Sequence, residues 1–139
     1  MKATQSSVGR ELEQFQLWII PMCDRLPKNS RSLDELGRKL IRDVNEAQCG
    51  VRLALKTSDA KTRLEIIESV ILFMEDVKSI MDAFVEYSST GNIRILSLKQ
   101  KSAYLTQIES ISRQLGGWER KTKNLVAEGR GEIVRQQCD

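Results

Sequence analysis

Apolar residues recur every three or four positions along most of this chain, which is the spacing of amphipathic helices. The first run spans residues 10–26 and has its apolar positions at Leu12, Phe15, Trp18, Ile19, Met22 and Leu26. Pro21 falls inside this run, and because proline lacks the backbone N–H that a helix needs, we expect it to kink or split the helix. Pro27 then ends the helix at a turn over residues 27–30.

A second helix is predicted to begin near Ser32, because Ser32 and Glu35 have the spacing of a capping box. In such a box the serine and glutamate side chains bond to backbone N–H groups of the first turn. We expect this helix to end near residues 57–58. Its apolar face consists of Leu33, Leu36, Leu40, Val44, Ala47, Val51 and Ala54.

A third helix is predicted to start directly afterwards, with Ser58 or Asp59 as its N-cap. Its apolar stripe is wide enough to face two neighbours and consists of Leu64, Ile67, Val70, Ile71, Met74, Val77, Ile80, Met81 and Phe84. Residues 88–92 form the clearest predicted loop. Ser97 then caps a fourth helix, whose apolar face includes Leu98, Tyr104, Leu105, Ile108, Ile111 and Leu115.

The fourth helix is predicted to stop at Gly116 and Gly117. Adjacent glycines are unfavourable inside a helix but suit its C-terminal cap, where the chain adopts a positive φ. We expect Trp118 to pack this end of the helix against the bundle. The polar residues 119–139 are predicted to be a frayed helix or disordered, and residues 1–9 to be a flexible N-terminus.

Four amphipathic helices with mostly short connections predict an all-α fold, an up-down antiparallel four-helix bundle over residues 10–118. The composition agrees, because aromatic residues make up 5% of the 139 positions and two prolines are present. The sequence contains no apolar run long enough to span a bilayer and no secretory signal. With an odd number of cysteines, we expect a cytoplasmic protein with reduced thiols and no membrane partner.

The residue types that most enzymes need are missing from the sequence. No histidine is present, which removes the commonest general base and the commonest metal ligand. The glycines match no phosphate-binding loop, and the pair Glu75 and Asp76 falls on the predicted solvent side of the third helix. We therefore expect no enzymatic activity, no metal and no cofactor.

Charge is segregated along the chain although the formal net charge is a mild +3. Residues 25–58 carry eight basic and four acidic side chains, and residues 94–123 carry seven basic and two acidic ones. Residues 59–87, in contrast, carry three basic and seven acidic side chains. The second and fourth helices are therefore basic and the third is acidic.

Helical phase places much of this charge on the outer faces. On the second helix, the face opposite the apolar one carries Arg38, Arg42, Asn45, Cys49, Arg52 and Lys56. On the fourth helix, the corresponding face carries Lys99, Ser102, Thr106 and Arg113. Such stripes are compatible with a solvated face, with a surface that binds the phosphates of a polyanion, or with contacts to the acidic third helix of another subunit.

Two segments near the ends of the predicted bundle carry recognisable motifs. The first is Leu26-Pro27-Lys28-Asn29-Ser30-Arg31 followed by Leu36-Gly37-Arg38-Lys39-Leu40. The second is Ile111-Ser112-Arg113-Gln114-Leu115-Gly116-Gly117-Trp118. With the acidic third helix and the start of the fourth at residues 95–100, these segments resemble a family of small four-helix bundles. Its members include the accessory variability determinant (Avd) of diversity-generating retroelements and proteins encoded in intervening sequences of 23S ribosomal RNA genes.

The resemblance implies a non-enzymatic accessory protein that forms a ring-like homo-oligomer, typically a pentamer. It also implies binding to a reverse transcriptase and to nucleic acid, meaning the template RNA and its cDNA. The candidate nucleic-acid-binding residues that match family motif positions are Lys28, Arg31, Arg38, Lys39 and Arg113. Phase and charge add Arg42, Arg52, Lys56, Lys99, Lys101, Arg120 and Lys121. The alternative is an oligomeric interaction bundle of the ribosomal intervening-sequence type with no role in nucleic-acid binding.

Overall fold

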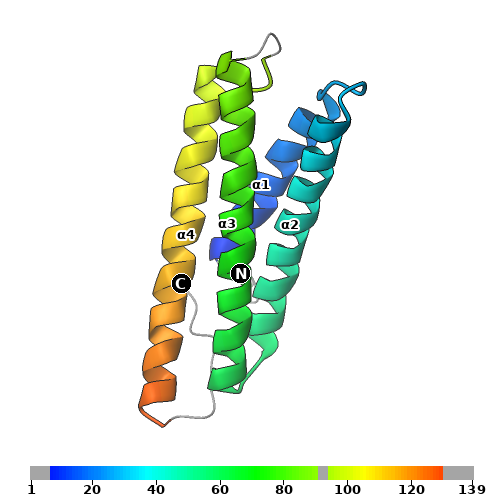
Figure 1. Ribbon diagram of the computed structural model, residues 1–139. Coiled ribbons are helices and arrows are strands. Elements are labelled where there is room, and N and C mark those ends of the chain that lie inside the picture. The colour runs from blue at the N-terminus through cyan, green and yellow to red at the C-terminus, as the bar shows by residue number, and fades with distance from the viewer. Residues whose placement is uncertain (1–6, 91–93, 130–139) are drawn as a thin grey trace.

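The computed structural model describes residues 7–90 and 94–129, and within these ranges it contains four helices and no strand. The helices are α1 (Ser7–Asp24), α2 (Arg31–Lys56), α3 (Ala60–Thr90) and α4 (Leu98–Ala127). Successive helices run in opposite directions along the bundle (Figure 1). This confirms the predicted all-α, up-down four-helix bundle. Residues 1–6 of the predicted N-terminal tail and residues 130–139 of the predicted C-terminal extension lie outside the described residues, as do residues 91–93, which include the last two residues of the predicted loop.

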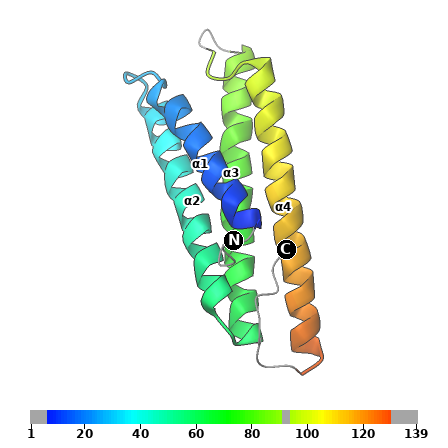
Figure 2. The same ribbon diagram turned by 180° about the vertical axis from the view of Figure 1, so that it is seen from behind.

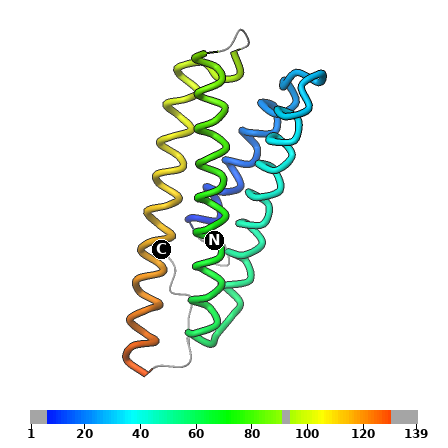
Figure 3. Tube along the Cα trace, viewed as in Figure 1, coloured from blue at the N-terminus to red at the C-terminus, as the bar shows by residue number. Residues whose placement is uncertain are grey.

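The four helices form a ring in which α1 closes against α4. Each helix packs on its neighbour in the chain, whereas the diagonal pairs α1–α3 and α2–α4 do not approach each other closely. α1 has 18 residues, so it is about 27 Å long, whereas α3 has 31 residues and is about 46 Å long. α1 therefore begins midway along the bundle and leaves the other end to α2, α3 and α4 (Figures 2 and 3).

One apolar core runs between the helices, and all four contribute to it. Most of the predicted apolar positions are buried, which confirms the phase assigned to each helix. Leu36, Leu64, Ile71 and Leu105 are half-buried, whereas Trp18 on α1 is 42% exposed and Leu98 at the start of α4 is 80% exposed. The most deeply buried side chains include Leu12, Phe15, Ile19, Leu40, Val44, Ile67, Phe84, Ile111 and Leu115.

α1 differs from the prediction at both ends. It starts at Ser7, and Val8 is buried, so residues 7–9 belong to the bundle and not to the predicted flexible N-terminus. The helix also continues through Pro21 to Asp24, so the predicted split is wrong. The hydrogen bond that proline removes is the one to the carbonyl of Leu17, and Leu17 lies on the exposed side of the helix, where water can replace it.

The N-caps of α3 and α4 are confirmed. Asp59 Oδ2 accepts hydrogen bonds from the Thr62 N–H at 3.0 Å and from the Thr62 hydroxyl at 2.6 Å. Ser97 caps α4 in a complete capping box with Gln100. α3 extends to Thr90, so the first three residues of the predicted loop are helical.

The N-cap predicted for α2 is wrong by two residues. Ser30 is the N-cap, and its hydroxyl accepts the N–H of Leu33. Glu35, the expected partner of Ser32, instead bonds to the guanidinium of Arg31. The helix ends at Lys56 with Thr57 as its C-cap, close to the predicted end.

The predicted stop at Gly116 and Gly117 is also wrong. Both glycines lie inside α4, which continues to Ala127, and among the described residues the glycine with positive φ is Gly129. Trp118 is buried, as expected, but its position is well inside the helix. Thr122 is buried one turn later, so residues 119–127 belong to the folded bundle and not to a frayed extension.

Arg63 is a buried cation that connects three helices. Its Nε donates to the Ala54 carbonyl at 2.7 Å, and its Nη2 donates to the Leu55 carbonyl at 3.2 Å. These carbonyls belong to the last turn of α2, where backbone acceptors have no partner within the helix. The guanidinium also lies 5.6 Å from the ring centroid of Trp118 on α4. Arg63 thus caps α2 from α3 and supports α4.

Candidate nucleic-acid interface

The strongest candidate interface is a row of polar and basic side chains on the outer side of α2. We call it the α2 stripe, and it consists of Arg38, Arg42, Asn45, Cys49, Arg52 and Lys56. All six residues are exposed, because the opposite side of the helix buries Leu40, Val44 and Val51 in the core. At 1.5 Å per residue, the stripe is about 27 Å long.

Two candidate cations at the start of α2 have carboxylate partners. Arg38 Nε lies 3.0 Å from Asp34 Oδ2, and Arg31 Nε lies 3.3 Å from Glu35 Oε2. Both pairs are solvent-exposed and one helical turn apart, and such pairs contribute about 0.3–0.5 kcal/mol. Because these pairs are weak, a phosphate can replace either carboxylate at little cost.

Lys39 is held more tightly than the other candidates. Its Nζ lies 2.7 Å from the buried carboxylate of Asp43 and 3.7 Å from Asp76 Oδ2 on α3. The hydrogen bond to Asp43 is the main reason that the pKa of Lys39 is raised. Its charge compensates a buried carboxylate, so Lys39 connects α2 to α3 and is less available to a ligand.

The other cations of α2 are free to meet a ligand. Arg42, Arg52 and Lys56 form no ion pair within residues 7–90 and 94–129. Lys28 is exposed in the turn that precedes α2. The centre of the candidate interface is therefore the part of the α2 stripe from Arg42 to Lys56.

Cys49 lies in the middle of this stripe and is exposed, whereas Cys23 is half-buried. Burial, with a smaller contribution from Asp24, raises the pKa of the Cys23 thiol to about 11. Cys23 is therefore protonated at neutral pH, and its thiol contacts the Gly37 carbonyl at 3.7 Å. These properties describe a structural cysteine and not a nucleophile.

The candidate residues of α4 do not form one row. Lys99, Arg113, Arg120 and Lys121 are exposed, and the outer side between Lys99 and Arg113 carries the hydroxyls of Ser102 and Thr106. Cations therefore lie toward the two ends of this side, with uncharged groups between them.

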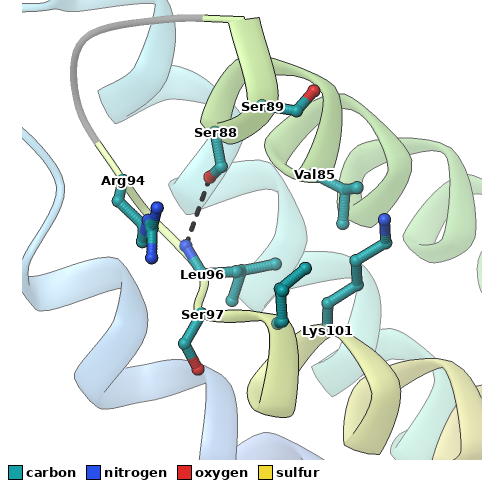
Figure 4. A pocket seen from close by; sticks show the side chains of 8 residues that line it. Val85, Ser88, Ser89, Arg94, Leu96, Ser97 and Lys101 are labelled. Carbon is teal, nitrogen blue, oxygen red and sulfur yellow. Dashed lines mark hydrogen bonds between the residues drawn. The ribbon is translucent and has the colours of Figure 1, made fainter.

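Lys101 lies on a different side of α4 and lines a pocket of about 170 Å³ at the α3–α4 turn. Figure 4 shows its side chain extending toward Val85 of α3, with Arg94 across the pocket. The turn is held by the Ser88 hydroxyl, which accepts the N–H groups of Ile95 at 2.9 Å and Leu96 at 3.2 Å. Lys101 thus faces the α3–α4 turn and not the outer side of α4 that carries Lys99 and Arg113.

The basic sides of α2 and α4 do not join into one surface. The two helices are diagonal in the ring, so their outer sides face away from each other. On one side α3 lies between them, with an outer face that carries the exposed acidic residues Glu65, Glu75, Asp76, Asp82 and Glu86. A short ligand on the α2 stripe would not reach the basic residues of α4.

A further surface of interest, which the sequence pattern did not identify, lies where α1 meets α4. Leu17 is 66% exposed and lies beside the partly exposed Trp18. The Trp18 ring meets the buried Tyr104 ring edge to face at 4.7 Å, and the Tyr104 hydroxyl donates to the Trp18 carbonyl at 3.3 Å. Residues 17–20 are four consecutive apolar residues, and one face of a helix cannot bury all four. This run was the feature of the sequence from which an exposed apolar surface on this helix could have been predicted.

Within the described ranges, no group of three acidic or cysteine side chains is arranged to hold a metal ion. No helix in those ranges has the length and apolar character needed to cross a bilayer. Comparison of the chain with protein-family models, curated proteins and solved structures finds no match. The geometry of the molecule and the motifs of its sequence therefore carry the functional argument.

Proposed function

We propose that this chain is a non-enzymatic, cytoplasmic accessory protein that binds nucleic acid through the α2 stripe. Its partner in this proposal is the reverse transcriptase of a diversity-generating retroelement, and the nucleic acid is the template RNA or its cDNA. The nucleic-acid part is supported by the exposed and unpaired cations Arg42, Arg52 and Lys56. The retroelement part rests on the motifs at residues 26–40 and 111–118.

The single observation that carries the proposal is the basic character of the α2 stripe. Its four cations lie along one side of α2 with Asn45 and Cys49 among them, and the exposed carboxylate of Glu46 lies beside the stripe, one turn after Arg42. Such a row neutralises phosphates without reading bases. The expected affinity is that of non-specific binding, with dissociation constants on the order of 10⁻⁴–10⁻⁶ M and a strong salt dependence.

The test is a double charge reversal, Arg42→Glu with Arg52→Glu, measured by fluorescence anisotropy of a labelled single-stranded RNA over a range of salt concentrations. Loss of two phosphate contacts should reduce the slope of log K against log salt by about 1.4, at about 0.7 per contact. Affinity at low salt should fall as well. An unchanged slope and affinity would show that the α2 stripe is not the interface.

The matched control is Lys61→Glu with Lys78→Glu on α3. Both lysines are exposed, and the double reversal changes the net charge of the protein by the same amount. It should weaken binding less than the α2 reversal and leave the salt slope nearly unchanged. Equal effects of the two double variants would mean that overall charge, and not the stripe, governs binding.

A second candidate function is an oligomeric interaction bundle, ring-forming as in the related family, without nucleic-acid binding. The observation that favours it is Leu72, which is 62% exposed among the acidic residues of the outer face of α3. An apolar residue within an acidic face is suited to docking on a basic face of another copy. If this function is correct, light scattering should show oligomers for the wild type and their loss for Leu72→Glu. The anisotropy assay should then show that the wild type leaves RNA unbound.

A further inference from the structure

We infer that the groove between α1 and the start of α4 is a binding site for unpaired nucleotides of single-stranded nucleic acid. We call this the α1–α4 groove. The inference rests on the proposed function, and it adds the kind of nucleic acid that is bound and a second place on the molecule that binds it. The groove encloses about 320 Å³.

Trp18 gives the groove a surface on which a base can stack. Its indole lines the groove beside Leu17 and Pro21, and 42% of the residue is exposed. The edge-to-face contact with Tyr104 and the hydrogen bond from the Tyr104 hydroxyl to the Trp18 carbonyl hold this part of α1 against α4. The indole is therefore fixed in position while much of its surface stays accessible, and base–aromatic stacking needs such a platform.

Two cations line the groove on opposite walls. Arg25 directly follows the last residue of α1, and Lys99 lies in the first turn of α4. None of the residues that line the groove is acidic. An aromatic surface between two cations matches the chemistry of a nucleotide, which presents a flat base and a phosphate on each side of its sugar.

The α1–α4 groove continues into a second, more open hollow of about 690 Å³ along the same seam. The two share Lys99 and Ala103, and the residues that line the second hollow include Ser102, Thr106 and Ser110, which carry hydroxyl groups. From Lys99 to Ser110, the wall formed by α4 is about 16 Å long. A strand of several nucleotides therefore has space along α4 beyond the stacked base.

One of the residues that line the second hollow is acidic, Glu11. Its Oε2 accepts a hydrogen bond from Gln114 Nε2 at 2.6 Å, and its backbone carbonyl accepts one from Gln107 Nε2 at 3.5 Å. Because this carboxylate is already hydrogen-bonded, the hydroxyl groups of α4 are the main contacts available to a sugar–phosphate backbone.

The lining favours a single strand over the apolar face of a partner helix. A docking helix needs a groove that stays apolar along several turns, whereas this seam carries the cations Arg25 and Lys99 and, farther along α4, residues with hydroxyl groups. A duplex is also a poor fit, since its bases are paired and stacked on one another and cannot lie on Trp18.

The experiment uses Trp18 fluorescence in a Trp118→Phe variant, in which Trp18 is the remaining tryptophan of the chain. Adding a short mixed-sequence single-stranded RNA should quench this emission, and the duplex formed with its complement should quench it far less. Circular dichroism checks that the variant keeps its helical content. Affinities measured by anisotropy in the wild-type background give a second readout that does not depend on Trp118→Phe folding.

In that background, Trp18→Leu should weaken binding of the single strand by about tenfold, because stacking is lost while an apolar side chain remains. Arg25→Gln with Lys99→Gln should reduce the salt slope by about 1.4. The matched control is Tyr87→Leu, which removes a partly exposed aromatic side chain from α3, the helix diagonal to α1, and should leave both quantities unchanged.

The outcomes separate this inference from the proposed function. RNA that binds through the α2 stripe without quenching Trp18, and with normal affinity for Trp18→Leu, overturns the groove site alone. A wild type that binds no RNA at low salt overturns both. Trp18 emission that shifts with protein concentration in the absence of RNA identifies the groove as a contact between copies and also overturns the site.

Discussion

At the scale of single residues, Arg63 has the largest structural role of any charged side chain in the described chain. It is 2% exposed, and it bonds to two carbonyls at the end of α2 while its guanidinium lies against Trp118. The partial negative charge at a helix C-terminus favours a cation there. Burying an arginine is otherwise costly, so these contacts decide whether the residue stabilises the fold.

We predict that Arg63→Met lowers the free energy of unfolding by about 2–4 kcal/mol, because the Ala54 and Leu55 carbonyls lose their bonds to the guanidinium and the Trp118 contact is lost. Urea denaturation followed by circular dichroism measures the change. The control is Lys61→Met two residues earlier on α3, an exposed site where a change within about 0.5 kcal/mol is expected. Equal midpoints for the two variants would contradict the capping role of Arg63.

Sequence reasoning did not identify Arg63, since it was counted with the other charges of the third helix. Its position falls near the buried side of α3, between Ala60 and Ile67, and this was a usable signal. A charged residue on a buried face needs a partner, but the partners are backbone carbonyls of α2. Carbonyl groups have no sequence signature, so the pairing depends on how α2 and α3 meet.

At the scale of helices, the sequence was most reliable where a side chain bonds to its own first turn. Asp59 and Ser97 cap their helices as predicted, because N-capping is local. The N-cap predicted at Ser32 is wrong because Ser30 is also a capping residue, and burial of Leu33 fits a helix that starts after the earlier serine. The helix end predicted at Gly116 and Gly117 is wrong because Trp118 and Thr122 pack in the bundle and the helix continues beyond the glycines.

Two glycines inside helices have opposite surroundings, so their substitution tests whether local helix preference or packing against a neighbouring helix sets the effect of a glycine. A Cβ added at Gly50 of α2 would lie 2.4 Å from Val70 Cγ2 on α3, whereas one added at Gly116 meets no atom within 4 Å. Gly50 therefore permits the close approach of α2 and α3. Gly116 has no such role.

We predict that Gly50→Ala destabilises the protein by about 1–3 kcal/mol through overpacking against Val70. Gly116→Ala should stabilise it by about 0.5–1 kcal/mol, because alanine favours the helix. Thermal denaturation compares the two variants with the wild type. A destabilising Gly116→Ala would indicate that the chain needs a glycine conformation there, as the predicted helix stop requires.

At the scale of the whole molecule, the ring order of the helices divides the candidate binding residues between different sides. α2 and α4 are diagonal, and the acidic face of α3 lies between them. The α1–α4 groove lies on the remaining side, next to α1. One short strand can therefore use the α2 stripe or the groove, but it cannot cover every basic residue that the sequence offers.

We predict that Arg120→Glu with Lys121→Glu, near the C-terminal end of α4, weakens binding of a short RNA no more than the Lys61 and Lys78 reversals do. The changes in net charge are identical, and neither pair belongs to the α2 stripe or lines the α1–α4 groove. Anisotropy titrations at a fixed low salt concentration make the comparison. An effect as large as that of the Arg42 and Arg52 reversals would place the main interface on α4.

The apolar pattern alone predicted the number of helices, the buried side of each and the outward direction of Arg42, Arg52 and Lys56. Helical geometry fixes angles within one helix, so this pattern was sufficient for these features. Packing between the helices sets which outer sides face the same way, and it leaves Trp18 exposed beside Arg25 and Lys99. Helices that pack together can be distant in sequence, and periodicity within one helix carries no information about such neighbours.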